Sequence, residues 1–440
     1  MRGSRQAHMH SFWFSLLGSL ASLALLGACG DRAAKSTDGP YADVVANVVP
    51  KLETQLGLKF KTPPKLEKKS RADVAKFLMA QLTSPRAKEQ LAGQQGAYRI
   101  LGMMPDTLDL GALLQRLLEE QVIGFYDPAT KVLYVVDGAP KALLDQTIAH
   151  ELVHALQDQY VKVDSIQGAV DNADRQAAAQ AILEGQAVFA QLRLDPSAGP
   201  MLVMPGGWDR IRDVIRDGQT GMPVFASAPR AVREGLLFPY LGGADFVRRF
   251  IEKRSQSELL TDLPVSTKQI LNDAAYFTAD KSKRDTPTDV TLPAPTVGKV
   301  TYTNTFGEFE ARLILVQHLK DEAVARRGAS GIDGDRYSLI STPQGDALAW
   351  ASVWDTPVDA GDFLDLLGDA IRRRYELAPP SVLPGSLVRH YEIAAKGSRG
   401  ARVITIRLEQ VDGRPLVYYI DAPAAVGDAI IDVKRITLGH

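Results

Sequence analysis

Residues Ala149 to Tyr160 read AHELVHALQDQY and carry two of the seven histidines in a 440-residue chain, His150 and His154. Residues four apart share one face of an α-helix, so the two imidazoles would point the same way, with Glu151 beside them. Two imidazoles so placed can bind one Zn²⁺, and the glutamate can take a proton from a water on that metal. The other faces of this helix are apolar, which predicts burial. The stretch therefore predicts a catalytic zinc site with Glu151 as general base.

A catalytic zinc ion needs a third protein ligand and keeps one position open. Glu184 is the best candidate, because no opposite charge lies beside it on a predicted helix over residues 173–194, and a buried carboxylate needs a cation. The small residues around it, including Gly185, predict a close approach of this helix to the histidine helix. The alternative is an exposed charge on an alanine-rich helix.

Three aspartates are further candidates. Asp171 and Asp174 are rival ligands, although they fall in a predicted loop or first helical turn. Asp158 follows His154 by one turn, so it is either a hydrogen-bond partner that orients this histidine or a solvated charge at the helix end.

The apolar pattern predicts an α+β fold. Residues 41–118 have mostly helical spacing, and residues 121–138 predict a β-hairpin whose second strand is Val132 to Val136. A helix over about 143–161 follows. Beyond the glycine- and proline-containing middle, helices alternate with strands, with a hairpin turn at residues 411–414. We therefore predict a core domain over 41–295 and an α+β C-terminal region over 296–440.

The first residues have the layout of a bacterial lipoprotein signal. Arg2 and Arg5 precede an apolar run that ends in Leu-Gly-Ala-Cys at Cys29, the only cysteine of the chain. The run is short for a membrane span, which needs about 20 residues. We predict a signal peptide over 1–28, lipidation of Cys29 and a polar tether over 29–40. Glycine after the cysteine favours the outer membrane, facing the periplasm.

The charges nearly cancel, with 51 Lys and Arg against 52 Asp and Glu. The chain as a whole therefore lacks the basic field that attracts nucleic acid, and we predict no nucleic-acid partner.

The motif set resembles the gluzincin metallopeptidases, and more narrowly a family of bacterial secreted and lipoprotein peptidases. The resemblance lies between about residues 100 and 365, in these segments: IGFYDPATKVLYVV, AHELVHALQDQY, LEGQA, LLFPYLGGADFV, LPVSTKQIL, NTFGEF, GIDGDRYSLI and SVWDTPVDAGDF. It implies a zincin-like, mainly helical core with a small β-sheet before the active-site helix.

The resemblance also implies site residues and a substrate. His150, His154 and Glu184 would be the zinc ligands, with Glu151 as general base. Residues 132–136 would form an edge strand that pairs with an extended peptide. The chain departs from the family at Asn272-Asp273, where histidine-proline is familiar, and at Val188, where some gluzincins have a carboxylate that supports a histidine ligand.

A peptidase also needs a donor to the oxyanion. Tyr240 is our first choice, and His318 and Tyr276 remain open. The leading hypothesis is a membrane-anchored zinc metallopeptidase that cleaves extended or unfolded envelope proteins. Two alternatives stay open: a non-catalytic envelope binding or scaffold lipoprotein with structural zinc, and a zinc amidase acting on another amide.

Overall fold

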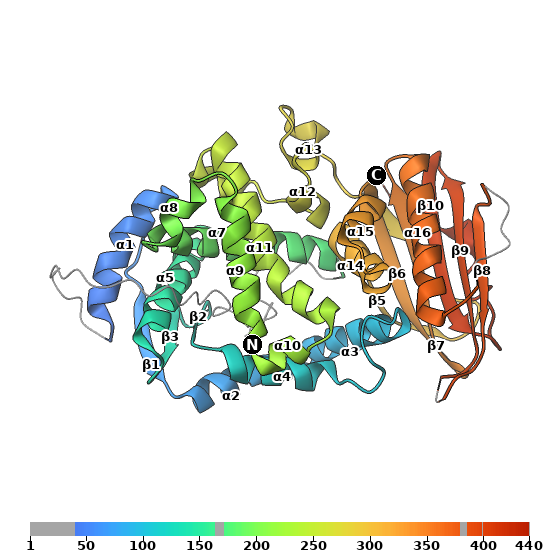
Figure 1. Ribbon diagram of the computed structural model, residues 1–440, viewed down its shortest axis with the longest axis horizontal. Coiled ribbons are helices and arrows are strands. Elements are labelled where there is room, and N and C mark those ends of the chain that lie inside the picture. The colour runs from blue at the N-terminus through green and yellow to red at the C-terminus, as the bar shows by residue number, and fades with distance from the viewer. Residues whose placement is uncertain (1–39, 163–170, 379–384, 398, 440) are drawn as a thin grey trace, which may run out of the picture.

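The computed structural model describes residues 40–162, 171–378, 385–397 and 399–439. The predicted signal peptide, Cys29 and nearly all of the tether lie outside these ranges. The described chain mixes helices and strands, in agreement with the α+β class. Helices dominate up to about residue 285, and most strands follow it (Figure 1). None of the described helices is both long and apolar enough to cross a membrane.

The helices and strands have the following bounds in chain order. The α-helices are α1 Ala42–Leu56, α2 Arg71–Leu82, α3 Pro85–Ile100, α4 Leu110–Gln121, α5 Lys141–Gln157, α7 Ala173–Leu194, α8 Ala198–Leu202, α9 Gly207–Thr220, α10 Pro223–Ser227, α11 Arg230–Lys253, α12 Thr267–Leu271, α13 Asp273–Tyr276, α14 Gly307–Leu319, α15 Glu322–Ala329 and α16 Pro357–Tyr375. The strands are β1 Lys65–Lys69, β2 Gly124–Asp127, β3 Val132–Val136, β4 Asp289–Thr291, β5 Lys299–Asn304, β6 Ile332–Thr342, β7 Gly345–Trp354, β8 Val388–Ile393, β9 Arg402–Val411, β10 Arg414–Pro423 and β11 Thr437–Gly439.

The small sheet beside α5 has the strand order β1-β3-β2. The predicted hairpin is confirmed, because β2 and β3 pair antiparallel. The expectation that residues 132–136 form an edge strand is wrong. β1 pairs parallel with β3 on its other side, and it comes from a segment whose spacing predicted mostly helix. The central strand β3 is therefore closed to a peptide, and β2 and β1 are the edges.

Helix α5 carries the histidine motif, and α7 matches the predicted helix over 173–194. α5 ends at Gln157, four residues before the predicted end. The close helix contact that Gly185 allows is with α11, and not with the histidine helix α5 as expected. A Cβ at Gly185 would lie 2.1 Å from the backbone carbon of Gly243 on α11, and a Cβ at Gly243 would lie 1.9 Å from the oxygen of Ala181. The small residues therefore let α7 cross α11 closely.

Replacing Gly185 with alanine is expected to destabilise the protein by about 2 kcal/mol or more, because the added methyl meets backbone that cannot turn aside. Gly218 on α9 is the matched control, since a Cβ there meets nothing within 4 Å and alanine favours a helix. Thermal unfolding of both variants checks this. Equal melting temperatures would contradict the close crossing.

The larger sheet has the order β5-β6-β7-β10-β9-β8, and its central strands β6, β7 and β10 are largely buried on both faces. Alternation along β7 places Trp350 and Trp354 against Phe363 of α16, with ring centroids 5.4 and 4.5 Å apart. Ala349, Ala351 and Val353 alternate with them and pack on the opposite face, in a cluster that includes Val290 of β4. The predicted turn at 411–414 is confirmed, with positive φ at Asp412 and Gly413.

The two parts of the chain meet at α3 and α14. A Cβ at Gly93 of α3 would lie 2.2 Å from the ring of Tyr302 on β5, so the absence of a side chain lets the helix rest on the sheet. α14 contacts α7, α11 and α12 on its other side. In Figure 1, α14 and α15 lie between the sheet and the central helices.

Candidate metal centre

Three predicted ligands come together between α5 and α7. His150 Nε2 lies 3.2 Å from Glu184 Oε2 and 3.2 Å from His154 Nε2, and His154 Nε2 lies 3.4 Å from the same glutamate oxygen. His150 and Glu184 are buried, whereas the His154 side chain is 18% exposed. Any approach from solvent therefore reaches the site on the His154 side.

The spacing of these atoms fits a tetrahedral metal. Ligand atoms at two corners of a tetrahedron with bonds of about 2.0–2.1 Å lie about 3.3–3.4 Å apart, because the edge is about 1.6 times the bond length. Two imidazoles and one carboxylate are also a ligand set that zinc enzymes use. Within the ranges described, no other His, Cys, Asp or Glu joins this group. The residues present thus fit a three-ligand zinc site.

Two glutamines hold the histidine rings, and the sequence reasoning missed both roles. His150 Nδ1 lies 3.2 Å from Gln191 Oε1, and His154 Nδ1 lies 2.9 Å from Gln157 Oε1. An amide oxygen only accepts, so each Nδ1 donates and each Nε2 faces the site. Gln157 is fixed in turn, because its Nε2 donates to the carbonyl of Leu183 and to Gln186. Buried glutamines on otherwise apolar helices were the available signal.

The support of His150 was unassigned at the sequence level. Gln191, two turns after Glu184 on α7, hydrogen-bonds His150 in place of a carboxylate at position 188. An amide replaces the carboxylate of some gluzincins and orients the ring without adding charge.

Glu151 lies beside the ligands and is anchored by β2. Its Oε2 accepts the backbone N–H of Tyr126 at 2.8 Å, and its buried Oε1 has no partner among the described residues. Burial raises the pKa of the Glu151 carboxyl, against the charges of His154 and His150. One oxygen is thus held and the other is free to accept a proton.

The ligands form a coupled charge cluster. Burial opposes ionisation of Glu184, yet the charge and hydrogen bonds of His154 and His150 lower its pKa to about 2. Burial also opposes the charge on His154, but the Glu184 carboxylate and Glu151 raise the pKa of His154 to about 9. Glu184 and His154 therefore stabilise each other's charged forms.

Among the three candidate oxyanion donors, only Tyr240 lies at the site. Its ring stacks on His150 with centroids 6.1 Å apart, and its buried hydroxyl has no hydrogen-bond partner among the described residues. Burial, with the charges of Glu184 and Glu151, raises the pKa of Tyr240 well above its usual value, so the hydroxyl stays a donor.

The other two donors are engaged elsewhere. The Tyr276 hydroxyl donates to the carbonyl of Asp262 at 2.5 Å. His318 Nε2 lies 2.9 Å from the carbonyl oxygen of Leu101, and burial lowers the pKa of this histidine to about 4.

The structure excludes the aspartates as ligands. Asp174 accepts bonds from the backbone and hydroxyl of Thr267, and Asp171 is not in the ligand group. Asp158 neither orients His154 nor is solvated. Asp158 Oδ2 accepts hydrogen bonds from Tyr126 Oη at 2.7 Å and from Lys131 Nζ at 2.6 Å. These bonds tie the end of α5 to the hairpin.

Residues 296–425 match a family model described as a domain of unknown function, DUF8575. The match covers less than a third of the chain, contains β5 to β10 with α14 to α16, and does not include the metal centre. Comparison with curated proteins and with solved structures returns no match.

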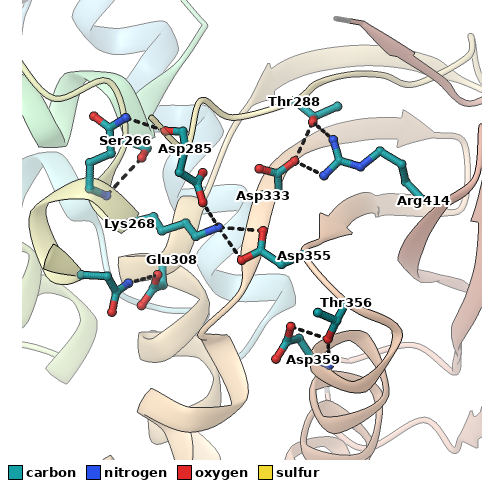
Figure 2. Close-up of polar contacts among 12 residues, drawn as sticks. Ser266, Lys268, Asp285, Thr288, Glu308, Asp333, Asp355, Thr356, Asp359 and Arg414 are labelled. Atoms are coloured by element: carbon teal, nitrogen blue, oxygen red, sulfur yellow. Dashed lines mark hydrogen bonds and ion pairs between the residues drawn. The ribbon is translucent and has the colours of Figure 1, made fainter. Parts of the chain in front are cut away.

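A second carboxylate cluster lies at the edge of the DUF8575 region, where Asp285, Asp333 and Asp355 approach one another (Figure 2). Lysine and arginine side chains of the protein already pair with these carboxylates. Lys268 Nζ lies 2.5 Å from Asp285 and 2.8 Å from Asp355, and Arg414 bonds Asp333. This cluster is therefore a structural ion-pair network that joins α12 to the sheet.

The departure at Asn272-Asp273 belongs to the same neighbourhood. Asn272 Nδ2 donates to Glu308 at 2.7 Å, and Asp273 pairs with Arg249 and Lys253 of α11. Both residues anchor α13 and have no contact with the metal centre.

Proposed function

We propose that this protein is a zinc-dependent metallopeptidase that hydrolyses peptide bonds of extended or unfolded cell-envelope proteins. The observation that carries the proposal is the grouping of three ligand atoms at tetrahedral spacing beside two buried groups, Glu151 Oε1 and the Tyr240 hydroxyl, that have no hydrogen-bond partner among the described residues. A structural zinc site closes on a fourth protein ligand and has no use for a free base.

The chemistry divides among few residues. A zinc ion held by His150, His154 and Glu184 would supply Lewis-acid activation of water and of the carbonyl group. Glu151 takes the proton of the attacking water on Oε1 while the Tyr126 amide holds Oε2. As the carbon–nitrogen bond breaks, this proton passes to the departing amine. The Tyr240 hydroxyl donates to the negative charge that develops on the carbonyl oxygen.

The local order of elements supports a zincin-like core. The β2–β3 hairpin precedes α5 with its two histidines, and α7 brings the third ligand. A peptide would then align along β2, the edge strand whose Tyr126 amide already contacts the base, in place of β3.

Residues outside the described ranges carry the rest of the proposal. A lipid on Cys29 would tether the domain to the membrane through residues 29–40, at the periplasmic face of the outer membrane. Such a tether would leave the metal centre free to meet unfolded envelope proteins.

The testing experiment measures zinc content and casein cleavage on the chain from residue 30 onward. We expect one zinc per chain, cleavage of casein, loss of cleavage after chelation and recovery on adding zinc. Stoichiometric zinc without cleavage of casein or a peptide library would sink the peptidase proposal and leave the structural-zinc alternative.

Replacing Tyr240 with phenylalanine is expected to lower kcat by about 10²-fold, because one oxyanion donor is lost. Zinc content and stability should change little, since Tyr240 is not one of the three ligands and its hydroxyl has no hydrogen-bond partner among the described residues. Tyr276→Phe is the matched control: it should keep activity and lose about 1 kcal/mol of stability with its bond to Asp262. An unchanged kcat in Tyr240→Phe would remove this residue from the mechanism.

A further inference from the structure

A cavity of about 190 Å³ lies where α3, α4, α7, α11 and α14 meet β5 and β6. Two helices that line it, α7 and α11, also carry residues of the metal centre. Gln180 lines it one turn before Glu184 on α7, and Pro239 lines it directly before Tyr240 on α11. The volume suits a single side chain or a small molecule.

Aromatic rings form much of the wall. Phe238 and Phe309 stack with centroids 4.0 Å apart, as do Phe306 and Tyr337, and Tyr302 adjoins the second pair. The faces of such rings carry negative charge density and attract ammonium and guanidinium groups.

Two polar side chains in the wall lack full hydrogen bonding. Glu310 accepts the Tyr98 hydroxyl on Oε1 at 2.7 Å, but its buried Oε2 has no partner in the described ranges. Gln180 is 7% exposed, and its amide has no hydrogen-bond partner among the described residues. Buried polar groups are nearly always satisfied, so the unmet Glu310 Oε2 in the cavity wall indicates a ligand.

Three buried carboxyl groups lie in or near the cavity wall. Asp174, Glu310 and Asp335 are carboxyl groups without an ion pair to lysine or arginine in the described part of the chain. Burial raises the pKa of each, to about 7 for Asp174 and Glu310. The groups that face Glu310 are the Tyr98 hydroxyl from α3 and Asp335 and Tyr337 from β6, none of which is a cation. A bound cation would stabilise the ionised form of Glu310.

We propose that this cavity binds an organic cation, an ammonium or guanidinium group on a short aliphatic stem. The stem would lie against the aromatic rings, the charged head would bond Glu310 Oε2, and the Gln180 amide would bond a further polar group. A basic side chain of a polypeptide and a free alkylamine share this chemistry. The proposal does not depend on the hydrolytic function.

The test titrates the full-length chain with hexylammonium and with its neutral counterpart 1-hexanol, by calorimetry at pH 8. Hexylammonium should bind at least tenfold more tightly than hexanol, and Glu310→Gln should remove this preference. Glu252→Gln, an exposed and distant glutamate, is the matched control and should bind as wild type does. Equal affinity for the two probes, or an unchanged preference in Glu310→Gln, would overturn the proposal.

The pH dependence has a definite sign. Glu310 must lose its proton to pair with the cation, so hexylammonium should bind about tenfold more tightly at pH 8 than at pH 6, for a pKa of about 7. Hexanol should bind equally at both values. Affinity for hexylammonium that is flat or falls over this range would count against the carboxylate as the partner.

A second variant keeps the test decisive if Glu310→Gln fails to fold. Gly235 of α11 lines the cavity, and a Cβ there meets nothing within 4 Å. Gly235→Leu should fill the space, favour the helix and abolish hexylammonium binding. A folded Gly235→Leu protein that binds like wild type would place the ligand elsewhere and refute the proposal.

The last arm distinguishes the two sources of the cation. An acetylated Gly-Lys-Gly amide is compared with the same peptide carrying norleucine. Binding of the lysine peptide that is lost in Glu310→Gln assigns the cavity to a basic side chain. Binding of hexylammonium alone assigns it to a small amine, and either result supports an organic cation.

Discussion

Replacing Glu151 with glutamine is expected to reduce casein cleavage by about 10³-fold while zinc stays bound. Glutamine keeps an oxygen for the Tyr126 amide and has nearly the same shape, so the histidines stay in place. It cannot take a proton from water at neutral pH. The result should therefore appear in kcat, measured beside zinc content on the same preparation.

Glu120→Gln is the matched control for this variant. The Glu120 carboxylate also accepts backbone N–H groups, from Val224 and Phe225, but it has no bond to the metal centre. It should keep full activity. If Glu151→Gln cleaves at the wild-type rate, another group takes the proton from water. If Glu151→Gln loses zinc, Glu151 acts as a ligand.

Replacing Glu184 with alanine is expected to weaken zinc binding by more than about 100-fold and to abolish cleavage. The variant removes one of three ligand atoms and the buried negative charge that a zinc ion would neutralise. Competition with a chromophoric chelator measures the affinity.

Gln191→Leu gives a graded comparison on the same helix. Its amide contacts His150 and not the metal position, so its loss should cost about 10–100-fold in zinc affinity. The expected order is wild type, then Gln191→Leu, then Glu184→Ala. If Glu184→Ala binds zinc as tightly as Gln191→Leu, Glu184 is not a ligand.

Much of the local structure followed from sequence pattern. The hairpin at β2 and β3, the span of α7 and the turn after β9 were predicted correctly, because alternation, helical spacing and an Asp-Gly pair act within a few residues. The prediction failed at β1. Its five residues KLEKK are mostly exposed and carry no apolar alternation, so only their pairing with β3 makes them a strand.

The candidate site, too, was predicted from the sequence only in part. The place of His150, Glu151 and His154 on one helix follows from a spacing of four, and the charge of Glu184 on an apolar helix pointed to the third ligand. The hydrogen bonds of Gln191 and Gln157 did not follow, since a glutamine in an apolar helix has many possible partners. Tyr240 was separated from Tyr276 and His318 only by the position of α11.

Sequence alone was sufficient for groups that a single helix or hairpin brings together, because backbone geometry sets their distances. Folding decided what depends on segments far apart in the chain. The Gly185–Gly243 crossing carries Tyr240 to the metal centre, and the junction of α3, α7, α11 and α14 with the sheet forms the cavity that Glu310 lines. Such contacts arise from burial and shape complementarity summed over the whole core, which no local pattern records.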